Sequence, residues 1–132
     1  MEKSIKIASK IDNINKIEKF IDDFSEKNEI NSEIYGKILI ATVEAVNNAI
    51  VHGNKEDINK YVNVTLNIKG DKIYIIVEDE GPGFDYSKVP DPTKPENVEN
   101  IHGRGIYLMQ HLADDVSFNE NGTIVTMEFN KE

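Results

Sequence analysis

The residues best suited to chemistry lie in one predicted helix, within the segment EAVNNAIVHGN (44–54). From Ile38 to Val51 most residues are Ile, Leu, Val or Ala, which indicates a core helix that is apolar around most of its circumference. Glu44 and Asn48 are four residues apart, so they stack one turn above the other on this helix. A carboxylate in an apolar setting costs roughly several kcal/mol unless its charge is compensated. The pair therefore faces either a wet or ligand-filled cavity, where it could bind a polar molecule, or a hydrated strip of surface.

Two glycine-containing turns supply the other candidate chemistry. DEGPGF (79–84) follows an apolar run, and HGRGI (102–106) leads into a helical pattern. Taken singly, glycines after a strand usually just turn the chain. DEGPGF lacks the alternating oxygen ligands and the final glutamate of a calcium loop, and the absence of Gly-Lys-Ser/Thr excludes a Walker-type phosphate loop.

The elements that must position these residues follow from hydrophobic periodicity. Residues 61–68 (YVNVTLNI) alternate between apolar and polar, which is typical of a half-exposed antiparallel strand, whereas 73–77 (IYIIV) predicts a more central strand. We predict further strands at 3–8, 115–118 and 123–129, with turns at Gly70-Asp71 and Asn121-Gly122. We also predict three helices: a first that is capped by Asp12 or Asn13, a second from Ser32 to Gly53, and a third over about 105–113. Residues 84–102 hold three of the four prolines and predict a surface loop. The predicted fold class is an α+β two-layer sandwich, with a mixed, mainly antiparallel sheet and helices on one face.

The composition excludes several classes of function. The 132 residues predict one domain, 1–132, with a single core. The absence of cysteine excludes disulfides, thiolate zinc sites and thiol nucleophiles, and three scattered histidines do not suggest a metal cage. A net charge of −9 argues against nonspecific binding to nucleic acid or to an anionic membrane surface, although backbone N–H groups can still bind an anionic ligand. No apolar run reaches ~18 uncharged residues and the N-terminus lacks the apolar core of a signal peptide, so we expect a cytoplasmic protein.

Three segments of the sequence, taken together and in order, resemble a known protein family, although none of them is specific enough by itself. They are EAVNNAIVHGN (44–54), EDEGPGFD (78–85) and GRGIYLMQHLADDVSF (103–118). In this order they resemble the N, G1 and G2 boxes of the GHKL-type ATP-binding domains, which DNA gyrase, histidine kinases and the MutL proteins share and whose architecture is the Bergerat fold. The resemblance covers essentially the whole chain as a single histidine-kinase-like ATPase domain. It is closest to the stand-alone anti-sigma-factor serine/threonine kinases of the RsbW type.

The resemblance implies that the cofactor is ATP (or ADP) and assigns residues to its base. Asp79 would accept a hydrogen bond from the adenine amino group, which the keto oxygen of guanine cannot donate, and such a charge-assisted bond is worth roughly 1.5–3 kcal/mol. Gly81 and Gly83 would let the backbone bend closely beneath the base. Thr123 matches a threonine whose hydroxyl helps to hold the adenine edge. Residues 84–102 would form a short ATP lid.

The same resemblance implies an end of the site for Mg²⁺ and the phosphates. Asn48 would offer its amide oxygen to Mg²⁺, and Glu44, one turn away, would act as the general base that orients an attacking hydroxyl. Gly103 and Gly105 would bring backbone N–H groups and a helix N-terminus up to the phosphates. Arg104 would either contact a phosphate or remain an exposed loop residue.

These roles leave three hypotheses for the function. The first is an ATP- and Mg²⁺-binding anti-sigma factor that phosphorylates a serine of an anti-anti-sigma (STAS-type) antagonist and sequesters a sigma factor by partner switching. The second is a non-catalytic, nucleotide-gated protein-binding module, and the third is a histidine-kinase-like catalytic domain that acts in trans. The presence of both Glu44 and Asn48 favours catalysis, but the first helix offers Lys16, Glu18 and Lys19 where better-known anti-sigma kinases carry an arginine. The resemblance also allows a homodimer.

Overall fold

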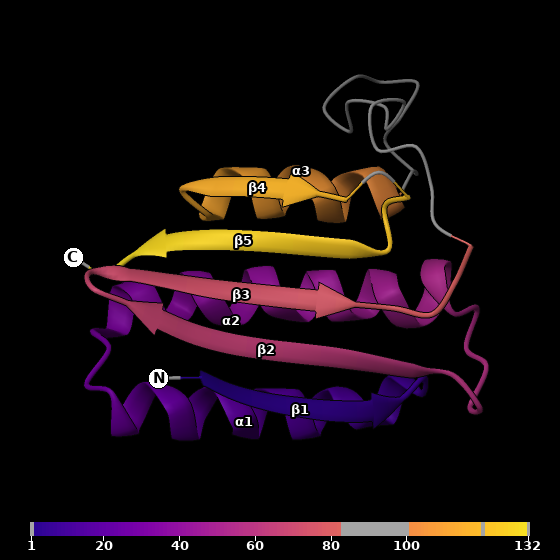
Figure 1. The fold of residues 1–132 in the computed structure, drawn as a ribbon, viewed down its shortest axis with the longest axis horizontal. Helices are drawn as coiled ribbons and strands as arrows, with labels where there is room; N and C mark the ends of the chain where they lie inside the picture. Colours follow the sequence, from indigo (N-terminus) through magenta and orange to yellow (C-terminus); the bar gives the residue numbers. More distant parts are fainter. Residues whose placement is uncertain (1, 83–100, 120, 132) are drawn as a thin grey trace.

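The computed structural model describes residues 2–82, 101–119 and 121–131, with the backbone alone for residues 101–104. Its elements run in the order β1 (Glu2–Ala8), α1 (Ile14–Lys27), α2 (Ser32–Asn48), β2 (Tyr61–Lys69), β3 (Lys72–Glu78), α3 (Ile101–Leu112), β4 (Asp115–Phe118) and β5 (Ile124–Asn130) (Figure 1). A 3₁₀ turn, Ile11–Asn13, precedes α1, and a π-helical turn, Ala49–Gly53, extends α2. Each helix and strand predicted from periodicity has a counterpart here.

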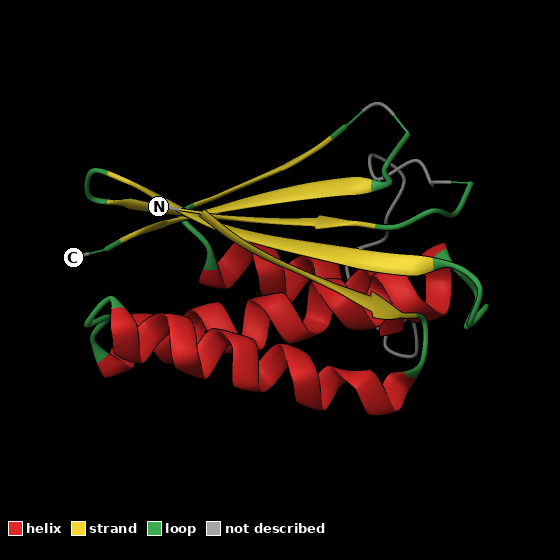
Figure 2. Cartoon of the chain, turned by 60° about the horizontal axis from the view of Figure 1, so that its bottom comes forward, coloured by secondary structure: helices red, strands yellow, loops and turns green. Residues whose placement is uncertain are grey.

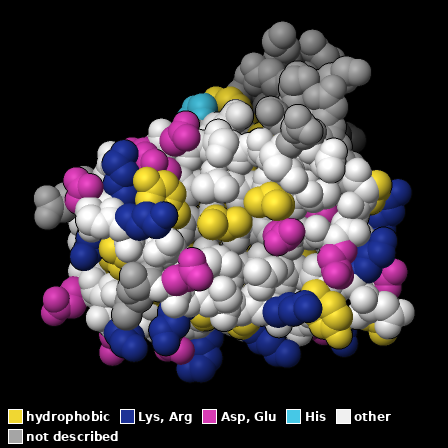
Figure 3. All heavy atoms as spheres, in the orientation of Figure 1, with side chains coloured by type: hydrophobic (Ala, Val, Ile, Leu, Met, Phe, Trp, Pro, Cys, Tyr) yellow, Lys and Arg dark blue, Asp and Glu magenta, His cyan; other side chains and the backbone are white. Residues whose placement is uncertain are grey.

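The five strands form one sheet in the order β1-β2-β3-β5-β4, and every neighbouring pair is antiparallel. The helices α1, α2 and α3 lie on the same face of this sheet (Figure 2). The opposite face is seen in Figure 3, where charged side chains gather mainly toward the margins. This arrangement confirms the predicted two-layer α+β sandwich, with described strands that are antiparallel throughout rather than mixed. Strand β3 takes the central place that its apolar sequence predicts.

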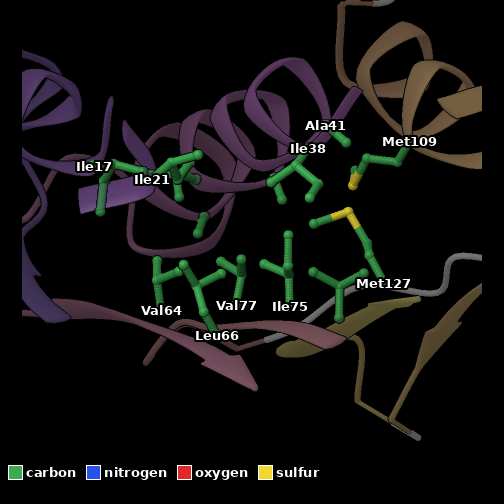
Figure 4. Close-up of a cluster of buried hydrophobic side chains, with 14 of the residues drawn as sticks. Ile17, Ile21, Ile38, Ala41, Val64, Leu66, Ile75, Val77, Met109 and Met127 are labelled. Carbon is green, nitrogen blue, oxygen red and sulfur yellow. The ribbon is translucent and has the colours of Figure 1, made fainter. Parts of the chain in front are cut away.

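The core lies between the sheet and the helix layer (Figure 4). The alternation in β2 places Val62, Val64 and Leu66 inward with no exposed surface, and β3 contributes Ile73 and Ile75, which are equally buried. The helices cover these strands with Ile17, Ile21, Ile38, Val46 and Met109. Because fully burying such a side chain is worth about 1.5–3 kcal/mol, this layer fixes how the helix ends lie over the sheet.

Helix α2 is the central helix of the layer, between α1 and α3. With its π-helical extension it forms a segment, Ser32–Gly53, that is long and apolar enough by length and composition alone to cross a membrane. In the structure this segment packs against the sheet and both neighbouring helices, and Ile38, Val46 and Ile50 have no exposed surface. Packing in the core therefore accounts for its apolar character.

The capping of two helices differs from the predicted chemistry. Asn13 makes no capping bond at the start of α1: its backbone is already helical, with φ of −75° and ψ of −7°, and its Nδ2 donates to the carbonyl oxygen of Ala8 at 2.9 Å. Helix α2 is capped by Asn31, one residue before the predicted start, and its Oδ1 accepts a backbone N–H at 2.9 Å. The two predicted turns are confirmed, since Gly70 and Gly122 have φ of +63° and +73°. Only the turn glycines, whose backbone conformation is locally determined, were predictable in detail.

Candidate functional site

One pocket lies where α2, β3, α3 and β5 converge, a hollow of about 470 Å³ counting the space open to solvent. Polar side chains face it from separate segments of the chain, among them those of Asn48, Asp79 and Thr123. Its apolar wall comprises Ala45, Ala49, Val77, Ile106, Met109, Phe118 and Val125. A mostly apolar wall with a few placed polar groups is typical of a small-molecule site. The structure thus brings together the three segments that the sequence singles out.

Asn48, which lines this pocket, and Glu44, one turn earlier on α2, both lie close to Gly105 in the second turn of α3. A β-carbon added at Gly105 would lie 3.1 Å from Glu44 Oε2 and 3.0 Å from Asn48 Nδ2. Asn48 is 9% exposed, and among the described residues neither atom of its side-chain amide has a hydrogen-bond partner. An unpaired buried polar group costs about 1–3 kcal/mol. Asn48 therefore lines the pocket and not a hydrated strip of surface, and among the described residues nothing pairs with its amide.

The donor set around Asn48 fits Mg²⁺ only in part. The unpaired amide oxygen of Asn48 is of the type that Mg²⁺ prefers, and this ion usually keeps several waters and takes further oxygens from phosphates. Within the described ranges there is no cluster of three or more His, Asp or Glu side chains that could hold a metal by themselves. A magnesium ion here would therefore depend on the phosphates of a bound nucleotide for most of its ligands.

Asp79, which also lines the pocket, directly follows β3. Its N–H donates to the carbonyl oxygen of Thr123 at 2.9 Å, and its Oδ1 accepts the N–H of Gly81 at 2.8 Å. Burial raises the pKa of Asp79 above its ordinary value, and the nearby Glu78 carboxylate acts in the same direction, while the Gly81 N–H opposes both. The site thus holds a partly buried carboxylate that gains from a further hydrogen-bond donor.

Thr123 is held beside Asp79 by its own turn. Its N–H donates to Asn119 Oδ1 at 2.9 Å, and its Oγ1 accepts from Asn119 Nδ2 at 3.0 Å. Asn119 Oδ1 also accepts the N–H of Ile124 at 3.1 Å, which joins the turn to the start of β5. The predicted neighbours Asp79 and Thr123 therefore lie together, and both residues line the pocket.

Gly81, which is predicted to lie beneath the base, also makes a close contact that the sequence did not predict. A β-carbon at Gly81 would lie 1.9 Å from the carbonyl oxygen of Gly53, so the turn after β3 rests directly on the end of the π-helical segment. A β-carbon at Gly53 would in turn lie 2.5 Å from Asp79 Oδ2. The close approach is thus one of backbone to backbone. Gly83, the second predicted glycine of this turn, lies outside the described residues.

The start of α3 differs from the prediction. The helix begins at Ile101, four residues before the predicted start, so Gly103 and Arg104 lie in its first turn and Gly105 is its fifth residue. The first four N–H groups of a helix have no partner within it, which leaves the Gly103 N–H available but not that of Gly105. The role of Gly105 in this structure is close packing against Glu44 and Asn48. The side chain of Arg104 lies outside the described atoms.

Sequence reasoning missed Asn54, which is buried at 1% exposure directly after the helix-ending glycine. Its Oδ1 accepts the N–H of Glu80, the residue next to Asp79, at 2.7 Å. The available signal was an asparagine just after a helix end, which is common in turns of every kind. The pocket-lining Phe118 was likewise predicted only as a strand residue.

Comparison with known proteins gives matches along the chain. The model of the family described as "Histidine kinase-like ATPase domain" matches residues 7–129. Serine-protein kinases RsbW from Staphylococcus aureus strains JH9 and Newman are each 38% identical to the chain over 96 residues. These alignments take in 67% of this chain and 60% of the relative, so the chain matches less than two thirds of the length of these relatives.

Among solved structures, the crystal structure of the RsbU and RsbW domains of a Mycobacterium tuberculosis protein is similar, with a TM-score of 0.70. The match covers 98% of this chain and 32% of that one at 16% sequence identity, and so it shows a shared fold. The family model extends from β1 into β5 and takes in every element around the pocket. On this evidence the chain belongs to the family of histidine kinase-like ATPase domains.

Proposed function

We propose that this protein binds ATP with Mg²⁺ and transfers the γ-phosphoryl group to a serine of a partner protein, as an anti-sigma factor of the RsbW type. The single observation that carries the proposal is the buried amide of Asn48, which has no hydrogen-bond partner among the described residues and lies close to Gly105, as the Glu44 carboxylate also does. The Staphylococcus aureus relatives are named serine-protein kinases, which supports the choice of serine as acceptor.

The base of the nucleotide is proposed to lie at the Asp79 end of the pocket. The Asp79 carboxylate would accept a hydrogen bond from the amino group of adenine, and guanine presents a keto oxygen there that cannot donate. Thr123 lines the same pocket, and its hydroxyl would contact the adenine edge. The apolar side chains of Val77, Ile106 and Met109 would cover the faces of the ring and exclude water.

The phosphates are proposed to lie between Asn48 and the first turn of α3. Asn48 Oδ1 would hold Mg²⁺, which when bound neutralises charge on the phosphates. The free N–H groups of the first turn of α3, that of Gly103 among them, would donate to phosphate oxygens, and the Arg104 side chain would add a cation. Glu44 would orient the serine hydroxyl and accept its proton, while the serine oxygen bonds to the γ-phosphorus and the bond to the bridging oxygen breaks.

The proposed partners are a sigma factor and its STAS-type antagonist. Phosphorylation of the antagonist would decide which of the two is bound, and we place this exchange in the cytoplasm. Helix α1 carries Lys16, Glu18 and Lys19 in the region where better-known anti-sigma kinases have an arginine. The proposed partner would therefore be recognised by a surface of α1 that lacks this arginine. A homodimer stays a prediction from the resemblance.

A binding module without catalysis is the second candidate, and one observation favours it. Gly105 packs so closely on Glu44 and Asn48 that little space separates α3 from the carboxylate in this structure. In that case nucleotide binding would gate partner affinity without phosphoryl transfer. The third hypothesis, a histidine-kinase-like domain acting in trans, gains no specific support from the described residues.

One experiment separates the three candidates. The purified protein is incubated with Mg²⁺, ATP labelled at the γ-phosphate and a STAS-type protein from the same genome, and the labelled residue is identified. Label on serine is expected. Label on histidine would favour the domain acting in trans, and tight binding of the STAS-type protein without label would favour the binding module.

A further inference from the structure

The side chain of Asn54 makes three hydrogen bonds, which join three segments of the chain. Its Nδ2 donates to Ser9 Oγ at 2.7 Å and to the carbonyl oxygen of Tyr61 at 3.0 Å. Its Oδ1 accepts the N–H of Glu80 at 2.7 Å. Asn54 and Ser9 are 1% and 0% exposed, so the bond between them does not compete with bulk water. A buried amide with every donor satisfied is a rigid connector.

The connector ends on the peptide group that follows Asp79. The N–H of Asp79 donates to the Thr123 carbonyl oxygen at 2.9 Å, and the next N–H along the chain, that of Glu80, donates to Asn54. The main chain is therefore held on both sides of the Asp79 α-carbon. Since the carboxylate also lies against the backbone of Gly53, the direction in which it points is set by these contacts.

We propose that Asn54 is a positioning residue for recognition of the nucleotide base, aiming the Asp79 carboxylate at the amino group of adenine. This inference rests on nucleotide binding, one part of the proposed function, and does not require phosphoryl transfer. Asn54 does not line the pocket, so it acts through the turn at residues 79–81 and not by touching the ligand.

The hydrogen bonds of Asn54 to Glu80 and to Ser9 allow a positioning role for Asn54 to be distinguished from a purely structural one. The bond to Glu80 reaches the site, whereas the bond to Ser9 leads away from it, to the carbonyl oxygen of Lys60, which Ser9 Oγ donates to at 2.7 Å. A loss of stability would follow from cutting either end, because each leaves buried polar groups unpaired. A loss of base recognition would follow only from cutting the end at Glu80.

The test compares Asn54→Ala with Ser9→Ala by calorimetric titration of ATP and GTP, with circular dichroism and thermal melting as checks of folding. For Asn54→Ala we expect the preference for ATP over GTP to fall by about tenfold or more, as expected for loss of a charge-assisted bond. For Ser9→Ala we expect a lower melting temperature and a preference within about twofold of the wild type. A folded Asn54→Ala protein with an unchanged preference would overturn the proposal.

A second measurement keeps the inference testable if Asn54→Ala does not fold. In the wild-type protein the amide proton of Glu80, although its residue is exposed, should be protected from exchange with solvent, as a proton bonded to a buried acceptor is. Exchange of this proton at the rate of an unstructured peptide would overturn the proposal. Nucleotide binding by a wild-type protein that leaves no label on a partner would refute the kinase and leave the role of Asn54 standing.

Discussion

At the scale of single residues, Asp79 is the group whose chemistry depends most on its surroundings. Burial raises its pKa above the ordinary 3.8, and the Gly81 N–H compensates only part of that effect. A carboxyl group with a raised pKa in the folded state disfavours folding when it is ionised, so the cost is present at neutral pH. The cost is relieved as the pH falls through the raised pKa. The free protein thus keeps a destabilising charge that a bound amino group would stabilise.

Replacing Asp79 by Asn should therefore weaken ATP binding and yet stabilise the nucleotide-free protein at neutral pH. The amide side chain of asparagine removes the buried charge, and its NH₂ group would face the amino group of adenine, so that two hydrogen-bond donors oppose each other. Urea unfolding should show a stabilisation that shrinks toward acid pH, where wild-type Asp79 is protonated, and calorimetry should show the weaker binding. Asp71→Asn makes the same chemical change at an exposed carboxylate in the turn between β2 and β3 and serves as control, with ATP affinity retained. An unchanged dissociation constant for ATP in Asp79→Asn would rule out the adenine assignment.

Replacing Glu44 by Ala should abolish phosphoryl transfer and leave ATP affinity within several-fold of the wild type. A general base contributes about 10²–10⁴-fold to the rate, whereas the nucleotide is held by other groups. Label transferred to the partner serine measures the first quantity, and calorimetry measures the second. Glu33→Ala, an exposed carboxylate in the first turn of the same helix, should change neither. Transfer at the wild-type rate by Glu44→Ala would remove Glu44 from the base role.

At the scale of elements, the glycines of this fold are needed for different reasons. Gly36 lies inside α2, and a β-carbon there would meet no atom within 4 Å. Gly70 lies in the turn between β2 and β3 with φ of +63°, a conformation that other residues rarely adopt. The first glycine therefore weakens a helix without a packing reason in the described structure, and the second is required by its turn.

Gly36→Ala should accordingly stabilise the protein by about 1 kcal/mol, because alanine favours the helix and restricts the unfolded chain. Gly70→Ala, the same change at a positive φ, should destabilise it by about 1–2 kcal/mol. Denaturant unfolding of the two variants beside the wild type measures both effects. A loss of stability in Gly36→Ala would mean that a group outside the described structure packs on this face of α2.

Periodicity predicted most of these elements because burial of one face is a local pattern. The alternation of residues 61–68 reappears in β2, and the apolar run 73–77 is the central strand. The start of α3 was not predictable, since Gly103 and Gly105 disfavour a helix by their propensity and only packing of Gly105 on Glu44 explains its presence there. The same distinction holds for the site. The types of its residues could be predicted from the sequence, but the burial of the Asn48 amide without a partner among the described residues depends on tertiary contacts and could not.

At the scale of the whole molecule, the pocket joins the ends of elements that meet only in the folded chain. Asn48 ends α2, Asp79 follows β3 and Thr123 precedes β5. A ligand that contacts all three binds the folded state and not the unfolded chain. Binding must therefore raise the stability of the entire domain, by about 2.7 kcal/mol when the ligand is at 100 times its dissociation constant.

Thermal melting should consequently rise with ATP and Mg²⁺ and fall back in part when EDTA removes the metal. Asn48→Ala should abolish the difference between Mg²⁺ and EDTA, because it removes the proposed protein ligand of the ion. Asn47→Ala, a change to the neighbouring residue on the same helix, should preserve that difference. A melting temperature that responds equally to Mg²⁺ in Asn48→Ala would exclude this asparagine from the metal site.

The contact between Gly53 and Gly81 limits how this domain can be altered. A β-carbon at Gly81 would lie 1.9 Å from the carbonyl oxygen of Gly53, and a β-carbon at Gly53 would lie 2.5 Å from the Asp79 carboxylate, so neither position has room for a side chain while Asp79 keeps its place. In a library of all single substitutions, these two positions should accept nothing but glycine in clones selected for nucleotide binding. To change the base preference, a designer would need to replace side chains around the contact between Gly53 and Gly81 and keep both glycines.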